Sequence, residues 1–163
     1  MRLATELPGP AKRAEARSSF ITSTNSPNIL ASTVSPSIAT HSNSKVLCKH
    51  PRNLTDDQFH IICNRGGLVG LNYFKAFLND DPAKADIEDL FAHAEHFLSL
   101  GGADVIAMGS DFDGSDMPHG ITGLESVEDI ANVFLRHNLP EALVDKIFFE
   151  NAASFFKRFD RNA

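Results

Sequence analysis

The chain has no tryptophan, one tyrosine and two cysteines among its 163 residues. Cys48 and Cys63 fit neither a C-x-x-C nor a C-x-x-C-H pattern, which argues against a redox motif and against a disulfide framework. No apolar run approaches the about eighteen residues that a membrane-spanning helix needs, and the N-terminus lacks the apolar core of a signal peptide. We therefore expect reduced thiols, a cytoplasmic location and no membrane partner.

The chain also lacks an excess of positive charge. Its 15 basic and 21 acidic residues are intermingled and give a formal net charge of −6, which leaves no basic face for nucleic acid. The hydrophobic fraction of 42%, with 13 phenylalanines, is well above that of disordered chains. We expect no nucleic-acid partner and one domain with a substantial core.

Residues 1–35 differ from the rest of the sequence. They mix Ser, Thr, Asn and Pro with isolated apolar residues and fit neither the helical nor the strand period. This pattern predicts a low-complexity, poorly ordered N-terminal segment. The folded part is then expected to cover residues 36–163.

From residue 36 onward the sequence alternates between strand and helix patterns. Thr55 and Gln58 form a capping box at the start of a helix that Gly66 and Gly67 end. We expect strands in 36–44, 68–74 and 103–114, and helices in 54–67, 84–102, 126–138, 139–150 and 151–159, with Ser126 as an N-cap. The order β-α-β-α-β-α-α-α predicts an α/β fold with a parallel sheet.

Polar side chains gather at the ends of the three predicted strands. His41 lies in the polar cluster that ends the first strand, Asn72 lies near the end of the second, and Asp111 and Asp113 lie at the end of the third. Ligands in parallel α/β folds bind beyond the carboxyl ends of the strands. These groups are therefore predicted to converge on one rim of the sheet.

The motifs "THSN" (40–43), "HPRN" (50–53) and "GSDFDG" (109–114) occur in this order, separated by the strand "GLVGLNYF" and the helix "HAEHFLSLGG". Together they resemble the C-terminal portion of the membrane dipeptidase family, peptidase family M19, from about Pro36 to Phe159. Thr40, one residue before the histidine of the first motif, is a small departure from the family pattern. The resemblance implies a (β/α)8 TIM barrel, of which this chain holds about three C-terminal β/α units plus terminal helices. It also implies a zinc-dependent dipeptidase with two zinc ions and a dipeptide substrate.

The same resemblance implies roles for individual residues. His41 matches a histidine ligand of one zinc ion, and Asp111 matches the catalytic aspartate. Arg52 matches the residue that binds the terminal carboxylate of the dipeptide, a task suited to the bidentate guanidinium group. Asn72 resembles a rim asparagine, which we group with Arg52 as substrate-binding.

Other residues of these types receive structural interpretations. His93 and His96 share a helix face without a third ligand in view, and we interpret them as structural. Asp113 and Gly114 are expected to shape a turn. A calcium loop at "DFDGSD" is rejected, since Thr122 stands where an EF-hand needs a bidentate glutamate.

A competing interpretation is a phosphatase of the haloacid-dehalogenase type, with magnesium. Asp111 would be the nucleophile and Asp113 the acid/base, and Lys146 is the only plausible downstream lysine. This interpretation leaves "HSNS" and "HPRN" unexplained.

The chain lacks most of the family's metal ligands. No H-x-D sequence occurs, and His41 is the only expected ligand that can be placed. One imidazole cannot hold a zinc ion, which takes about three or four protein ligands. We therefore expect a truncated enzyme that is weakly active or inactive alone. Three β/α units leave open strand edges, so self-association, or a role as a non-catalytic interaction fragment, is the remaining alternative.

Overall fold

The computed structural model describes residues 19–21 and 36–160. Four parallel strands form one sheet in the order β1-β2-β3-β4. The strands are β1 (Ser19–Ile21), β2 (Ser37–Ala39), β3 (Leu68–Asn72) and β4 (Ile106–Ser110). The parallel sheet with connecting helices confirms the predicted α/β class.

Helices connect the strands and continue after the sheet. Between strands lie α2 (Asp56–Asn64), α3 (Lys75–Leu78), α4 (Ile87–Ser99) and the 3-10 turn η1 (Gly102–Asp104). After β4 come η2 (Leu124–Ser126), α5 (Val127–Arg136), α6 (Glu141–Asp145), the π-helical turn η3 (Lys146–Glu150) and α7 (Asn151–Asp160). Within the ranges given above, no helix is both long and apolar enough to cross a bilayer.

The strand β1 lies inside the N-terminal segment that the sequence predicts to be poorly ordered. Residues Ser19–Ile21 pair in parallel with Ser37–Ala39. Three residues are too few to show an alternating pattern, and pairing with a neighbouring strand decides their conformation. These three residues thus form a strand that the sequence did not indicate, while the prediction for the segment as a whole stays a prediction, since 1–18 and 22–35 lie outside the described residues.

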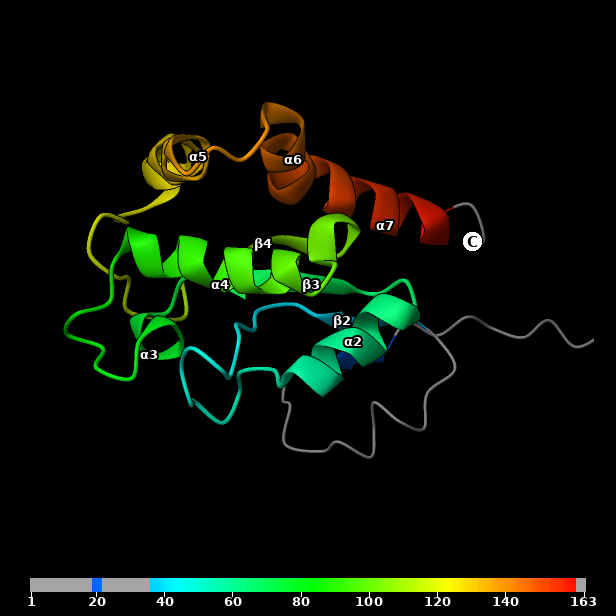
Figure 1. The fold of residues 1–163 in the computed structure, drawn as a ribbon, viewed down its shortest axis with the longest axis horizontal. Coiled ribbons are helices and arrows are strands. Elements are labelled where there is room, and N and C mark those ends of the chain that lie inside the picture. The colour runs from blue at the N-terminus through cyan, green and yellow to red at the C-terminus, as the bar shows by residue number, and fades with distance from the viewer. Residues whose placement is uncertain (1–18, 22–35, 161–163) are drawn as a thin grey trace, which may run out of the picture.

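One face of the sheet packs against α2 and α4. Phe59 of α2 and Phe97 of α4 stack with ring centroids 4.2 Å apart. They cover strand side chains that all point to this face, namely Ala39, Val69, Leu71 and Ile106. This is the larger of the two core clusters, and Figure 1 shows both helices in front of the strands.

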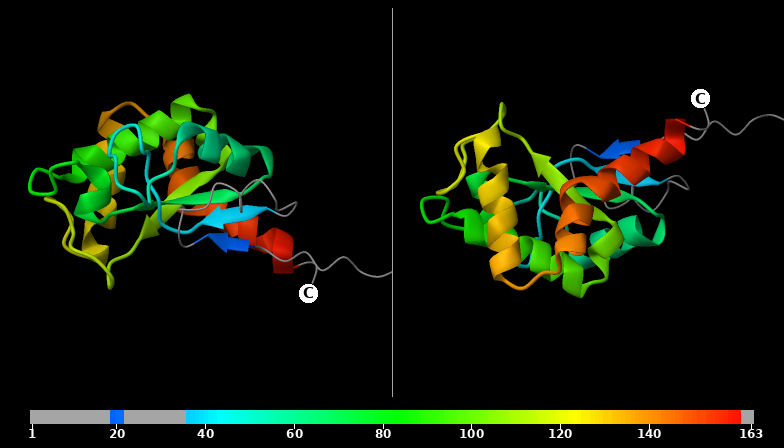
Figure 2. Two further views of the ribbon diagram at one scale, coloured as in Figure 1. Left: turned by 90° about the horizontal axis from the view of Figure 1, so that it is seen from below. Right: turned by 90° about the horizontal axis from the view of Figure 1, so that it is seen from above.

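The opposite face is covered near the beginning of the strands by α7. Phe155 packs there against Ile38, Leu68 and Ala107, which alternate with the residues of the first face. The side-chain amide of Asn151 donates to the carbonyl oxygens of residues 103 and 106, which fixes the start of α7 beside the start of β4. Figure 2 shows α7 on this second side. Because α7 packs near the beginning of the strands, it does not cover their carboxyl ends.

The two residues predicted to begin helices, Thr55 and Ser126, both occupy N-cap positions. Thr55 forms both bonds of the capping box with Gln58. Ser126 occupies the N-cap position of α5, but its hydroxyl does not bond the helix and instead accepts from the backbone N–H of Thr122. Ser126 is therefore the N-cap residue as predicted, but its hydroxyl bonds the preceding turn and not the helix.

Two glycines allow the chain after β2 to cross the neighbouring strands closely. A Cβ at Gly70 would lie 2.2 Å from the carbonyl oxygen of Thr40, and one at Gly109 would lie 2.4 Å from the same atom. The Ser42 N–H also donates to the Gly70 carbonyl at 2.8 Å. The loop that begins at His41 is therefore held directly over the ends of β3 and β4.

Candidate functional site

The four predicted site residues meet at the carboxyl ends of the strands, in two contacting pairs. Nη2 of Arg52 donates to Nε2 of His41 at 2.5 Å. Nδ2 of Asn72 donates to Oδ2 of Asp111 at 3.2 Å. The two pairs are also coupled, since the charge of Asp111 acts on the imidazole of His41. The predicted convergence is confirmed for His41, Asn72 and Asp111, while the chemical role of each residue stays a prediction.

The surroundings of His41 favour the neutral form of its imidazole. Burial lowers its pKa, Arg52 lowers it further, and Asp111 opposes both. Because a guanidinium can only donate, Nε2 must accept, and the ring proton sits on Nδ1. Nδ1 lies 2.6 Å from the Thr40 hydroxyl oxygen, which therefore accepts a hydrogen bond from the Nδ1–H group. Both ring nitrogens are thus engaged by the protein.

Asp111 sits at a strained turn. Ser110 and Asp111 have φ values of 40° and 76°, in the left-handed region that residues with a side chain rarely adopt. The pairing of β3 with β4 shifts register immediately before Asn72. The Asp111 carbonyl then accepts from the Ser115 hydroxyl at 2.9 Å, which helps to close the turn. This backbone directs the Asp111 carboxylate back toward β3.

Asn72 is fully buried, with 0% of its surface exposed. Its Oδ1 accepts from the Phe74 N–H at 2.5 Å, while its Nδ2 donates to Asp111. Both the oxygen and the nitrogen of this side-chain amide are thus hydrogen-bonded within the protein. A direct contact between Asn72 and a substrate stays a prediction.

An aromatic side chain that the sequence analysis did not single out supports Arg52. The Phe77 ring lies 5.3 Å from Cζ of Arg52, and the ring of His50 packs on it with centroids 4.2 Å apart. Burial, then Arg52, then Lys45 lower the pKa of His50. Phe77 belongs to α3, a helix of four residues without a sequence period of its own. No sequence signal pointed to it.

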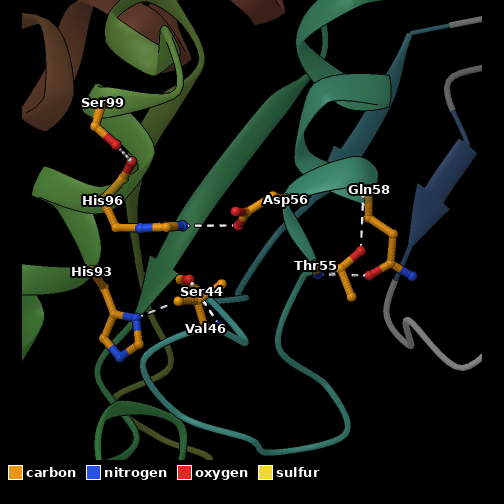
Figure 3. A network of polar contacts seen from close by, with 8 residues as sticks. All are labelled: Ser44, Val46, Thr55, Asp56, Gln58, His93, His96 and Ser99. Atoms are coloured by element: carbon orange, nitrogen blue, oxygen red, sulfur yellow. Dashed lines mark hydrogen bonds and ion pairs between the residues drawn. The ribbon is translucent and has the colours of Figure 1, made fainter.

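The loop 41–55, which carries His41 and Arg52, is fastened to α4 (Figure 3). Nδ1 of His93 accepts from the Ser44 N–H at 3.1 Å, and its Nε2 donates to the Leu78 carbonyl at 3.0 Å. His96 contacts the Asp56 carboxylate at 2.8 Å. Burial is the main cause that lowers the pKa of His93 to about 4. These contacts support the structural interpretation of the histidine pair.

A cleft adjoins Asp111 on the side of the following turn. Its volume is about 690 Å³, within the range of small-molecule sites. Phe112, Met117 and Leu124 give it apolar walls, and Leu124 is exposed. Asp113 lies on the cleft in the turn, exposed, where the sequence predicts a turn-shaping residue. The cleft has room for a small ligand beside Asp111.

The described part of the chain does not complete a zinc site. It contains no group of three or more His, Cys, Asp or Glu side chains placed to hold a metal ion. His41 already gives Nε2 to Arg52, and Asp111 accepts from Asn72. Zinc takes about three or four protein ligands, so further ligands would have to come from elsewhere.

The position of Lys146 contradicts the phosphatase interpretation. Its ammonium group forms an ion pair with Asp104, which precedes β4, whereas Asp111 follows β4. The two groups therefore lie at opposite ends of one strand. Lys146 is not available to a phosphoryl group at Asp111.

Comparison with known proteins links this geometry to one family. Residues 19–163 match the family model described as membrane dipeptidase (peptidase family M19), so the match begins at residue 19 rather than at about Pro36. An uncharacterised protein of the pqqA 5′ region in Klebsiella pneumoniae is 34% identical over 72% of this chain and 44% of its own length. An uncharacterised dipeptidase of Schizosaccharomyces pombe is 30% identical over 77% of this chain and 31% of its own length.

Two solved structures are similar as well. A dipeptidase described as a metallo peptidase of family M19 aligns with a TM-score of 0.75 and 33% identity over 80% of this chain and 39% of its own. A metallo peptidase from Rhodobacter sphaeroides, solved with a phosphinate mimic of the dipeptide L-Ala-D-Ala, gives the same TM-score and identity and is covered to 38%. The chain thus spans less than half the length of these relatives.

Proposed function

Since the chain belongs to the membrane dipeptidase family, peptidase family M19, we propose that it carries the substrate-recognition part of a dipeptide-hydrolysing site. The observation that carries this proposal is the meeting of the Arg52–His41 and Asn72–Asp111 pairs at one end of the sheet. A cation and a carboxylate from separate segments face one region there. This complements a dipeptide, which bears one charge of each sign.

The proposed chemistry assigns one task to each charged group. The Arg52 guanidinium, steadied by the Phe77 ring, binds the terminal carboxylate of the dipeptide. Asp111 holds the substrate's ammonium group or passes a proton to the leaving amine. The cleft beside Asp111 gives room for a substrate side chain.

Zinc dependence, which the family resemblance implies, is part of the proposal. His41 offers one ligand, and the others would come from outside the described residues. We therefore expect this chain to bind dipeptides with little or no turnover by itself. The comparison proteins are more than twice as long in the two solved cases, in keeping with a partial (β/α)8 barrel.

The test is dipeptide binding by the whole chain, measured by calorimetry with L-Ala-D-Ala, the dipeptide mimicked in the R. sphaeroides structure. Arg52→Ala should weaken binding about tenfold or more, because a charge-assisted bond to the carboxylate is lost. Arg136→Ala is the matched control: Arg136 is 67% exposed, pairs with Glu88 on α4 and takes part in none of the site contacts described above. Absence of binding by the unmodified chain, or an equal loss in the control, would overturn the proposal.

Self-association is proposed as a second property of the same chain. β1 and β4 are the two edge strands of the described sheet, and edge strands present unpaired backbone groups. Size-exclusion chromatography at two concentrations tests this property. A single monomeric peak at both concentrations would count against it.

A further inference from the structure

Three buried asparagines occupy the site region, and two of them belong to motifs whose asparagines have no assigned role. Asn43 ends "THSN", Asn53 ends "HPRN", and both are almost completely buried, as is Asn72. A buried amide costs free energy unless its donors and acceptor find partners. The bonds of each side chain therefore indicate what it does.

Asn43 holds the last residue of β3 from both sides of its backbone. Oδ1 of Asn43 accepts from the Asn72 N–H at 2.9 Å, and Nδ2 of Asn43 donates to the Asn72 carbonyl at 2.8 Å. These two bonds imitate the pairing of an adjacent strand at a point beyond the end of β2. Asn43 lies two residues after His41, so this clamp ties the beginning of the loop 41–55 to β3.

Asn72 passes this constraint on to Asp111. With its backbone held by Asn43, its side chain is fixed between the Phe74 N–H and the Asp111 carboxylate. The backbone of Asp111 is in a left-handed conformation that needs support from its surroundings. The bond from Asn72 supplies part of that support at the carboxylate itself.

Asn53 is built into the same network but does not touch Asn72. Its Oδ1 accepts from the Asn43 N–H at 3.2 Å, and its Nδ2 donates to the carbonyls of Cys48 and Phe77 at 2.9 and 2.8 Å. It therefore orders the loop beside Arg52. Asn43 and Asn53 share burial, chemistry and a bond to the Phe77 carbonyl, and differ in their contact with Asn72.

We propose that Asn43 is a positioning residue for Asp111, acting through Asn72. Its clamp sets the distance from the His41–Arg52 pair to the Asp111 carboxylate before any ligand binds. The value of this arrangement for catalysis rests on the proposed function. The clamp itself does not, and it is tested without substrate.

The test compares Asn43→Asp with Asn53→Asp in the full, isotopically labelled chain. Each replacement keeps the side-chain shape and turns the donors into acceptors facing the Phe77 carbonyl, so both variants lose stability. Hydrogen exchange of the Asn72 side-chain amide, followed by NMR, should become about tenfold faster in Asn43→Asp and less than about twofold faster in Asn53→Asp. Equal acceleration in both variants, or none in Asn43→Asp, would overturn the proposal.

Two further measurements keep the proposal testable if the aspartate variants do not fold. Asn43→Ser and Asn53→Ser introduce no charge and are compared in the same way, with the same expected difference. In the unmodified chain, the backbone amide nitrogen of Asn72 should show a scalar coupling to Cγ of Asn43 through the hydrogen bond between them. Absence of this coupling would refute the clamp directly. Dipeptide binding in the unmodified chain separates a failure of the proposed function from a failure of this inference.

Discussion

Arg52 donates a hydrogen bond to His41 across 2.5 Å, although the two residues are supplied by opposite ends of one loop. The bond occupies the lone pair of Nε2. A metal ion bound on this side of the ring would need the same lone pair. The Thr40 hydroxyl engages the other nitrogen. The orientation of the His41 ring is thus set by Thr40 and Arg52, at the two ends of the loop.

The first prediction concerns the ring proton of His41. Nitrogen NMR of the histidine side chains should show His41 neutral with its proton on Nδ1, since Nε2 accepts from Arg52. In Arg52→Ala this preference should be lost and both neutral forms should appear. Lys84→Ala, which removes an exposed cation paired with Asp81, is the control and should leave the His41 signals unchanged. A proton found on Nε2 in the unmodified chain would contradict the observed pair.

The second prediction concerns acid stability. The folded-state pKa of His93 is about 4 against 6.5 for the unfolded chain, so the unfolded state binds more protons between these values. The free energy of unfolding should therefore fall as the pH drops from 6.5 to 4, by about 3 kcal/mol at most from this group. The slope from this group should fade above pH 6.5 and be nearly absent about one pH unit higher.

Denaturant titrations across this pH range provide the measurement. His93→Gln should be less stable at neutral pH, because it disturbs the bonds to Ser44 and Leu78, but should show a flatter pH dependence. His60→Gln replaces an exposed histidine of α2 and should retain the slope of the unmodified chain. Equal slopes in all three proteins would rule out His93 as the cause.

The third prediction concerns the crossing of the chain over the sheet. Gly70→Ala places a Cβ 2.2 Å from the Thr40 carbonyl oxygen, a backbone atom that cannot move aside. The variant should lose about 3 kcal/mol or more, or fail to fold. Gly101→Ala meets no atom within 4 Å and pays only for a left-handed backbone at φ 86°, about 1 kcal/mol. Thermal unfolding of the two variants checks the difference, and similar losses would disprove the close approach.

The fourth prediction concerns the start of α2, where the loop 41–55 ends. Thr55→Ala removes the side-chain acceptor for the Gln58 N–H and should cost about 1 kcal/mol. Thr55→Ser keeps the hydroxyl and should cost much less. Chemical denaturation of both variants measures the effect. A loss of the same size in Thr55→Ser would show that the methyl group, and not the cap, is responsible.

Local patterns predicted the elements and the location of the site well. The Thr55–Gln58 capping box and the apolar run that became β3 depend on residues close in sequence, and both are confirmed. The rim follows from general topology, because parallel strands place their carboxyl ends at one edge. His41, Asn72 and Asp111 therefore met where the sequence predicted.

Long-range partners escaped prediction. The bonds of Asn43 to Asn72 join residues 29 positions apart, and no spacing rule encodes such a pair. Phe77 supports Arg52 from a helix too short to show a period. β1 has only three residues, and its strand conformation depends on pairing with β2. These features are set by tertiary contacts rather than by local preference.

The packing of Phe155 on the second face of the sheet has a consequence during protein synthesis. Ile38, Leu68 and Ala107 leave the ribosome well before Phe155 does, so this apolar surface is formed before its cover exists. A nascent chain with strands and without α7 would offer that surface to chaperones or to other emerging chains. This apolar surface therefore stays uncovered until α7, the last described helix to be translated, has folded onto the sheet.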